Sequence, residues 1–334
     1  MVVFHHFMQS FFAFQSESFV GRFFSQYGNF GVDVFFVLSG CVMYLSVRKR
    51  RDAQGSFLLE RLFRIVPIYW FYTAVMVVAV ELMPRAFAYT HATFGSVLCS
   101  LVFFPCINPS GLGYFPLLTV GWTLNFEMFF YLVLAICVAV VQRYAILVCV
   151  LVMLALPEFT PATWAYAPVL KNTLLREFVA GMTLGWIWFG GADKFCAALP
   201  RWVSIASSAV AFFFAIYAYR SGWQSSQLVL ASIVVWCALV FESAGPTLPS
   251  QWKRWGGHLG DVSYSTYLSH AIVIGLFLHV IGAKPQGGML VLALAGVICA
   301  TYLISLGSYR WVETNNGLRT VRQKLQAKLP PRCP

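Results

Sequence analysis

The sequence is poor in charged residues, and this scarcity argues against a soluble protein. Only 10% of its 334 residues are Asp, Glu, Lys or Arg, whereas 59% are hydrophobic. Its mean hydropathy of +0.73 is far above that of water-soluble globular domains. Acidic residues are especially few, with 12 Asp and Glu against 23 Lys and Arg, which gives a net charge of +11. We therefore expect an integral membrane protein.

Several familiar signatures are also missing. The nine cysteines show no CxxC spacing, and no GxGxxG or Walker-type phosphate loop is present. We expect no metal site and interpret six cysteines in or beside apolar runs as packing residues rather than bridges: Cys41, Cys99, Cys137, Cys149, Cys237 and Cys299. The lack of internal repeats disfavours a transporter, and acid-poor loops disfavour a membrane glycosyltransferase.

The positive charge is concentrated in two stretches that flank apolar runs. Residues 48–64 hold six Lys or Arg against two acids, and residues 310–334 hold six against one. Basic flanks of membrane segments face the cytoplasm, and no nucleic-acid-binding motif offers another explanation, so we expect no nucleic-acid partner. The pattern predicts a membrane domain over residues 1–309, followed by a basic cytoplasmic tail over 310–334, in the inner (plasma) membrane.

Nine apolar runs are long enough to span, or nearly span, a bilayer. They lie at roughly 28–47, 65–83, 121–141, 144–156, 171–190, 202–219, 227–243, 263–282 and 289–309. A shorter run at 94–104 makes the number of crossings between the two basic stretches odd. Because both stretches must be cytoplasmic, either 94–104 or 144–156 does not cross. We predict an all-α, polytopic transmembrane bundle of about ten helices.

The chain opens on a short apolar segment that contains two histidines. Residues 1–14 read MVVFHHFMQSFFAF, too short to span a bilayer, and resemble the outer half of a helix. We expect either a helix that begins inside the bilayer or a true start upstream of Met1. His5 and His6 point about 100° apart on a helix, so both cannot face one cavity. One could act as a general base or transient acyl carrier; alternatively both are ordinary bundle histidines.

Other ionisable residues lie inside apolar runs, where each costs about 2.5–3.5 kcal/mol at a helix centre and therefore suggests function. Asp33, in GVDVFFVLSG, would orient a histidine, bind an arginine or favour a helix N-terminus. Glu127, in GWTLNFEMFFYLV, is a lone carboxylate with Tyr131 one turn later. Its alternatives are a catalytic role and a structural pairing with an arginine.

Two further patterns have both a functional and a structural explanation. Arg61 and Arg64, in FLLERLFRIVPIYW, share a helix face and could bind phosphates, or could extend to the membrane interface. Pro67, just after them, is expected to start or kink a helix. A stripe of polar residues on one helix face near the C-terminus either lines a cavity or forms hydrogen bonds between helices: Ser263, Thr266, Tyr267 and His270.

Five segments, in this order and over nearly the whole chain, resemble the membrane-bound acyltransferase 3 family, particularly its exopolysaccharide and O-antigen O-acetylase branch. They are GVDVFFVLSG, FLLERLFRIVPIYW, GWTLNFEMFFYLV, LLREFVAGMTLGW and LGDVSYSTYLSH. The resemblance implies transfer of an acyl group, usually acetyl, from cytoplasmic acyl-coenzyme A to a sugar hydroxyl of a lipid-linked or nascent surface glycan. Acyl-coenzyme A is then a co-substrate, with no bound cofactor. The alternative is a transporter or a lipid-linked glycan flippase.

The resemblance also assigns roles to residues. It implies that His6, or else His5, is the catalytic histidine, with Glu127 and Asp33 orienting it and Arg61 and Arg64 holding the donor. Residues matching the family's other motif positions are expected to line the cavity: Ser39, Trp122, Tyr131, Tyr264, Tyr267 and His270. The family places an essential arginine eleven residues before its histidine, and no such position follows Met1. We therefore expect either an upstream start or an inactive protein.

Overall fold

The computed structural model describes residues 1–49, 56–87, 90–220, 226–244 and 250–329, and within these ranges it contains helices and connecting turns but no β-strand. The α-helices are α1 (Val2–Phe12), α2 (Phe19–Tyr27), α3 (Phe30–Lys49), α4 (Ser56–Leu82), α5 (Phe94–Leu101), α6 (Trp122–Val141), α7 (Ala145–Phe159), α8 (Ala167–Leu170), α9 (Leu174–Ile187), α10 (Asp193–Ala198), α11 (Arg201–Arg220), α12 (Ser226–Ala244), α13 (Ser250–Ile281), α14 (Gly287–Ser308) and α15 (Asn316–Gln326). Short 3-10 or π turns are η1 (Thr119–Gly121), η2 (Gln142–Tyr144), η3 (Trp188–Ala192) and η4 (Tyr309–Glu313). The predicted all-α class is confirmed.

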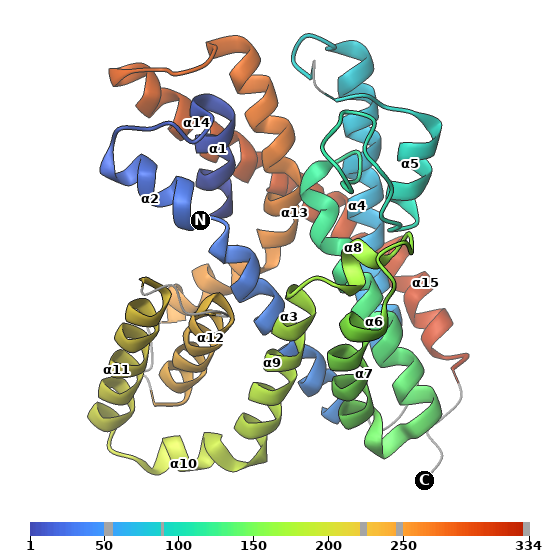
Figure 1. The fold of residues 1–334 in the computed structure, drawn as a ribbon, viewed down its shortest axis with the longest axis vertical. Coiled ribbons are helices and arrows are strands. Elements are labelled where there is room, and N and C mark those ends of the chain that lie inside the picture. Colours follow the sequence, from blue (N-terminus) through green and yellow to red (C-terminus); the bar gives the residue numbers. More distant parts are fainter. Residues whose placement is uncertain (50–55, 88–89, 221–225, 245–249, 330–334) are drawn as a thin grey trace.

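Several helices are long and apolar enough to cross a membrane. In the described part of the chain, five stretches meet this criterion: Phe30–Arg48, Leu58–Leu82, Thr119–Phe159, Ser250–Ile281 and Gly287–Glu313. The third contains both α6 and α7, which form a hairpin through η2 (Figure 1). Each of the nine predicted apolar runs coincides with a helix, namely α3, α4, α6, α7, α9 and α11–α14. The protein is therefore a multi-pass helical membrane protein.

The short run at 94–104 forms only the eight-residue helix α5. At 1.5 Å per residue this helix is about 12 Å long, less than half of a 30 Å hydrocarbon core. The hydroxyl of Thr93 caps its N-terminus by accepting a hydrogen bond from the backbone of Ser96 at 3.2 Å. Without α5, the predicted apolar runs between the two basic stretches form eight helices in the described part of the chain, namely α4, α6, α7, α9 and α11–α14. Eight crossings would be the even number required when both stretches face the same side.

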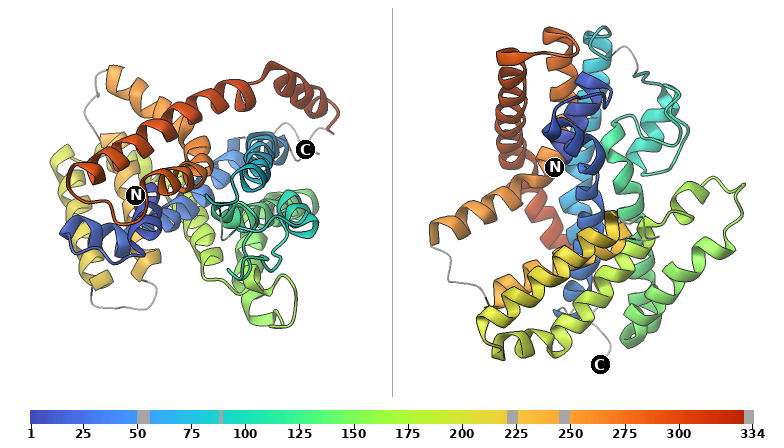
Figure 2. Two further views of the ribbon diagram at one scale, coloured as in Figure 1. Left: turned by 90° about the horizontal axis from the view of Figure 1, so that it is seen from above. Right: turned by 60° about the vertical axis from the view of Figure 1, so that its left-hand side comes forward.

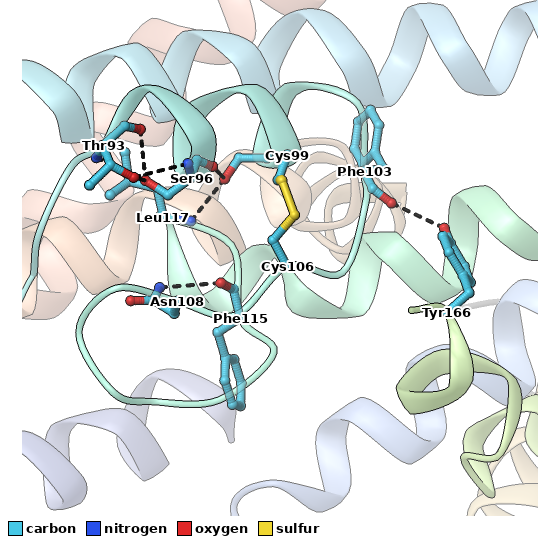
Figure 3. Close-up of a disulfide and its surroundings, with 10 residues drawn as sticks. Thr93, Ser96, Cys99, Phe103, Cys106, Asn108, Phe115, Leu117 and Tyr166 are labelled. Carbon is cyan, nitrogen blue, oxygen red and sulfur yellow. Dashed lines mark hydrogen bonds between the residues drawn. A yellow bond between two sulfur atoms is a disulfide. The ribbon is translucent and has the colours of Figure 1, made fainter. Parts of the chain in front are cut away.

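A disulfide joins Cys99, in the last turn of α5, to Cys106 in the following loop (Figure 3). Our interpretation of Cys99 as a packing residue was therefore wrong. The chain reverses after α5 at Phe103, which has a positive φ of 56°, and this reversal brings the two sulfurs together. The backbone N–H of Leu117 donates to Ser100 Oγ at 2.9 Å and closes the loop over α5. Of the other five cysteines predicted to pack, Cys41, Cys137 and Cys149 are buried free thiols, Cys237 is a partly buried one, and Cys299 is exposed and so does not pack in the core.

Helix α3 runs through the middle of the bundle, with α9 packed along it (Figure 1). Glycines make this approach close, because a Cβ on Gly181 would lie 1.9 Å from the carbonyl oxygen of Val37, and one on Gly40 would lie 2.2 Å from that of Phe178. Phe178 also stacks on Phe130 of α6, with ring centroids 4.2 Å apart. The core thus centres on α3, α6 and α9.

Two groups of helices flank this centre. Figures 1 and 2 show α11 and α12 as a hairpin on one side, while α1, α13 and α14 lie toward the opposite end of the molecule. The backbone N–H of Lys284, between α13 and α14, donates to the carbonyl of Phe11 at 2.9 Å and ties down the end of α1. Gly28 permits close approach of α1, because a Cβ there would lie 2.5 Å from His5 Cβ.

Candidate active site

A cavity of about 430 Å³ lies between α3, α4, α6 and α13, and its lining joins residues that are far apart in the sequence. The polar residues predicted for the site that line it are Ser39, Arg61, Arg64, Glu127, Tyr131, Tyr264 and Tyr267. Apolar side chains, such as Phe35 and Leu124, make up much of the remaining wall. A volume of this size fits a small organic group.

Glu127 is the carboxylate of this cavity and is only 4% exposed. Its Oε1 accepts hydrogen bonds from Tyr131 OH and, at 3.0 Å, from Ser39 Oγ. Its Oε2 is buried without a hydrogen-bond partner. Buried carboxylate oxygens are normally satisfied, so the arrangement fixes one oxygen and leaves the other available to a ligand.

Arg61 and Arg64 bring positive charge to the same cavity from α4, where both act electrostatically on Glu127. Pro67 lies inside α4 and does not start it, because the helix begins at Ser56, one turn before the arginines. Both arginines also line a second cavity of about 500 Å³ beside η4 and α15. They therefore stand between two cavities.

The structure distinguishes between the two adjacent histidines of α1. His5 turns toward α2, where its Nδ1 donates to the carbonyl of Phe24 at 3.0 Å. His6 faces His270 of α13, with ring centroids 5.2 Å apart. Its Nδ1 lies 2.9 Å from Gln9 Oε1, a contact that an Nδ1–H tautomer satisfies because an amide oxygen can only accept. Nε2 of His6 is then the proton acceptor of the ring.

His270 connects His6 with the cavity. It is fully buried, and neither ring nitrogen has a hydrogen-bond partner. Its ring centroid lies 5.8 Å from that of Tyr267, whose hydroxyl donates to the carbonyl of Val120 at 2.5 Å and lies 3.1 Å from Thr123 Oγ1. His270 does not itself line the cavity, contrary to expectation, whereas Tyr267 does.

Asp33 lies elsewhere. Its carboxyl group is buried in the first turn of α3, which is the helix N-terminal position that the sequence offered as one alternative. It lies beside the carboxyl group of Glu177 on α9, and not beside the histidine or arginine of the other two alternatives. The close packing of α3 on α9 places these two acids face to face. The predicted role of Asp33 in orienting the histidine therefore has no contact to support it among the described residues.

Trp122 also departs from its expected position. It does not line the cavity and instead packs edge-to-face on Phe126 and Phe115, at centroid distances of 5.6 and 6.2 Å. The rings of Trp122 and Phe126 thus lie on the face of α6 that turns toward the preceding loop, which contains Phe115. Trp122 is thus one turn too early, and on the wrong face, to reach the Glu127 carboxylate.

Sequence reasoning missed some of the lining. Thr123 is four residues before Glu127 and eight before Tyr131, so a stripe of polar residues at helical spacing could have identified it. Glu177 lies in the segment LLREFVAGMTLGW, but its contact with Asp33 could not be predicted, because the rotation of α9 against α3 cannot be read from either segment. The described residues contain no group of three or more His, Cys, Asp or Glu side chains that could hold a metal ion.

Comparison with known proteins identifies the family. Residues 1–310 match the family described as an acyltransferase domain. The chain belongs to the acyltransferase 3 family. It is also 32% identical over 302 residues to the exopolysaccharide production protein ExoZ of Rhizobium meliloti (strain 1021). The aligned region covers 86% of this chain and 88% of that protein. No solved structure matches the chain. The protein is therefore a membrane acyltransferase.

Proposed function

We propose that this acyltransferase transfers an acetyl group from acetyl-coenzyme A to a sugar hydroxyl of an exopolysaccharide or a related cell-surface glycan. One observation supports this most directly: a single cavity brings Glu127, its hydroxyl partners and the two arginines of α4 together. The similarity to a protein named for exopolysaccharide production supports a glycan acceptor. The family match favours acyl transfer over a transporter or flippase.

The donor approaches through the two arginines. Guanidinium groups pair well with phosphates, and Arg61 and Arg64 border the second cavity on one side and the Glu127 cavity on the other. The phosphates of acyl-coenzyme A would stay outside, and the thioester would enter between α3 and α6. Arg48 of the neighbouring basic residues donates to the carbonyl of Phe189, while positions 50–51 lie outside the described residues.

The chemical step needs a base and a means of holding the thioester. His6 Nε2 accepts the proton of the sugar hydroxyl, whose oxygen bonds to the thioester carbonyl carbon. The carbon–sulfur bond breaks, and the coenzyme A thiolate takes up a proton as it leaves. His270 and Tyr267 connect His6 with the cavity. Glu127, oriented by the hydroxyl groups of Ser39 and Tyr131, places its second carboxylate oxygen at the cavity, where it can accept a hydrogen bond from a substrate.

The orientation in the membrane follows from charge and from the disulfide. Disulfides persist in oxidising compartments, so the loop that carries Cys99 and Cys106 would face outward. The basic stretches beside α4 and α14 would then face the cytoplasm, where acyl-coenzyme A is made. We place the protein in the plasma membrane with its C-terminus in the cytoplasm and the glycan acceptor on the opposite side.

The proposal is tested by measuring ester-linked acetate released from surface glycan with mild alkali. Cells that lack the gene are complemented with the wild type, Glu127→Gln or His6→Gln, at matched membrane abundance. We expect acetate with the wild type and a loss of about 100-fold or more in each variant, since each removes a charged or proton-accepting group from the site.

Two exposed positions provide matched controls for these variants. Glu242→Gln and His279→Gln remove the same chemical groups from the surfaces of α12 and α13, and both should keep wild-type acetate levels. Equal acetate with and without the wild type would refute the proposed reaction for that glycan.

The orientation is tested separately with a membrane-impermeant maleimide applied to intact cells. After mild reduction, Cys99 or Cys106 should be labelled from outside. A cysteine introduced by Lys328→Cys in the tail should be labelled only after lysis. Labelling of Lys328→Cys in intact cells would reverse the assigned orientation.

A further inference from the structure

The second cavity is built partly by the C-terminal helix α15, which lies beyond residue 310, where the match to the family ends. Its volume is about 500 Å³, and it is bordered by α4, α13, η4 and α15. Four arginines line it: Arg61 and Arg64 from α4, and Arg319 and Arg322 from α15. On both helices the arginine pair has the same three-residue spacing, so each pair occupies one helix face.

Contacts along one face of α15 hold it against α4, as Figure 1 shows for the two helices. Leu318, Arg322 and Gln326 recur at intervals of four and are the less exposed residues of this face. Gln326 Nε2 donates to Glu60 Oε1 of α4 at 3.2 Å. Asn315 caps the helix by accepting from the backbone of Gly317 at 2.8 Å. The helix is therefore positioned as part of the fold, with Arg322 directed toward α4.

Arg322 has an unfulfilled hydrogen-bonding requirement. Its Nε is buried and has no hydrogen-bond partner, although guanidinium N–H groups can only donate and normally find acceptors when buried. Among the described residues, none forms an ion pair within 4 Å with any of the four arginines. An acceptor-rich anionic ligand would satisfy them.

Acidic residues also border the cavity, and they restrict what can bind. They are Glu60, Asp261 and Glu313, so four positive charges face three negative ones. Glu60 accepts from Gln326, and Glu313 accepts from Ser265, which directs two of these carboxylates into contacts within the protein. The balance remains in favour of an anion, and the cavity is large enough for more than one phosphate group.

We propose that α15 supplies half of the site for the phosphate groups of the acyl donor, with Arg319 and Arg322 facing Arg61 and Arg64 across the cavity. This inference rests on the proposed function, because it takes coenzyme A as the donor. The phosphates occupy the cavity beside α15, and the thioester passes Arg61 and Arg64 into the Glu127 cavity. The C-terminal segment is thus a binding element in addition to a basic tail.

The test uses the full-length protein in nanodiscs and two donors that differ only in the nucleotide part. Acetyl-coenzyme A carries the phosphates, whereas acetyl-N-acetylcysteamine is a thioester without them. The double variant Arg319→Gln/Arg322→Gln should raise KM for acetyl-coenzyme A by about 10-fold or more, because two charge-assisted contacts are lost. It should leave kcat, and all rates with acetyl-N-acetylcysteamine, unchanged.

The matched control removes two charges from the same segment without touching the cavity. Lys324→Gln/Lys328→Gln alters exposed residues of and just beyond α15 that do not line it, and it should keep the wild-type KM. Arg319→Lys/Arg322→Lys should recover part of the lost affinity. The inference would be overturned if Lys324→Gln/Lys328→Gln raised KM as much as Arg319→Gln/Arg322→Gln. It would also be overturned if the arginine variant lost activity equally with both donors.

A binding measurement separates this inference from the proposed function. Calorimetric titration of coenzyme A needs no turnover, so an inactive wild type that binds coenzyme A at least 10-fold more tightly than Arg319→Gln/Arg322→Gln would refute the reaction and support the site. If the wild type and Arg319→Gln/Arg322→Gln bound coenzyme A equally, or if the wild type did not bind it, the proposed phosphate site would be refuted. Unchanged coenzyme A binding with less co-purified anionic phospholipid would assign the arginines to lipid headgroups and would also overturn it.

Discussion

Glu127 and the Asp33–Glu177 pair are both buried acids in membrane helices, yet their surroundings differ. Glu127 borders a cavity, receives hydrogen bonds from two hydroxyl groups and keeps one oxygen without a partner. Asp33 and Glu177 contact each other in the tight interface between α3 and α9. The comparison teaches that an ionisable group in an apolar run indicates a polar environment, and only an adjoining cavity makes it a candidate for chemistry.

The largest expected effect is in the α3–α9 interface that contains Asp33 and Glu177. Gly181→Ala should abolish stable folding, because its Cβ would lie 1.9 Å from a backbone oxygen of α3 that cannot move independently. We expect a loss of more than about 3 kcal/mol, at or beyond the usual cost of overpacking. The measurement is the monodisperse fraction and melting temperature in detergent. Gly307→Ala, which meets no atom within 4 Å, should behave as wild type, and equal melting of the two would refute the close contact.

Neutralising the two kinds of acid should sharpen the comparison. Glu127→Gln should lower acyl transfer about 100-fold or more. Glu177→Gln should keep it within about threefold, because an amide can still donate a hydrogen bond to Asp33. Initial rates at matched abundance measure both. If Glu177→Gln lowered the rate of acyl transfer as much as Glu127→Gln, with an unchanged melting temperature, Asp33 and Glu177 would belong to the catalytic machinery.

A smaller effect is expected for the partner of Glu127 one turn along α6. Tyr131→Phe removes the hydroxyl that donates to Oε1 and should lower kcat about 10-fold, the equivalent of one hydrogen bond to a charged group. The exposed loop residue Tyr114 supplies the control, Tyr114→Phe, with no expected change. An unaltered kcat in Tyr131→Phe would mean that the orientation of Glu127 does not depend on this hydroxyl.

The smallest effect is expected at the other hydroxyl. Ser39 donates to the same oxygen at 3.0 Å, so Ser39→Ala should lower kcat only about threefold while Tyr131 remains. Ser232, whose hydroxyl donates to the carbonyl of Leu228 in its own helix, supplies the control, and Ser232→Ala should have no effect. If Ser39→Ala lowered kcat more than Tyr131→Phe in steady-state assays, Ser39 would be the main residue that orients the Glu127 carboxylate.

Much of the fold could be predicted from local sequence. Every long apolar run became a helix, and of the two runs that the parity of the basic stretches left open, 94–104 forms only the eight-residue α5 whereas 144–156 forms the fifteen-residue α7. The disulfide was not predicted, because its formation depends on the reversal at Phe103 and not on cysteine spacing. The site was predicted more fully in its members than in their contacts: Ser39, Glu127 and Tyr131 do meet, whereas Asp33 and Trp122 point elsewhere.

The sequence by itself determined the helices, the membrane environment and the small set of polar residues buried among apolar ones, because hydropathy and residue spacing act within a single segment. Only the tertiary structure decided that His6 and not His5 faces His270, that Asp33 meets Glu177, and that α15 brings two arginines to α4. The physical reason is that each of these contacts depends on how one helix is rotated and placed against another. That arrangement is set by close packing at positions such as Gly28, Gly40 and Gly181, and it involves segments far apart in the chain.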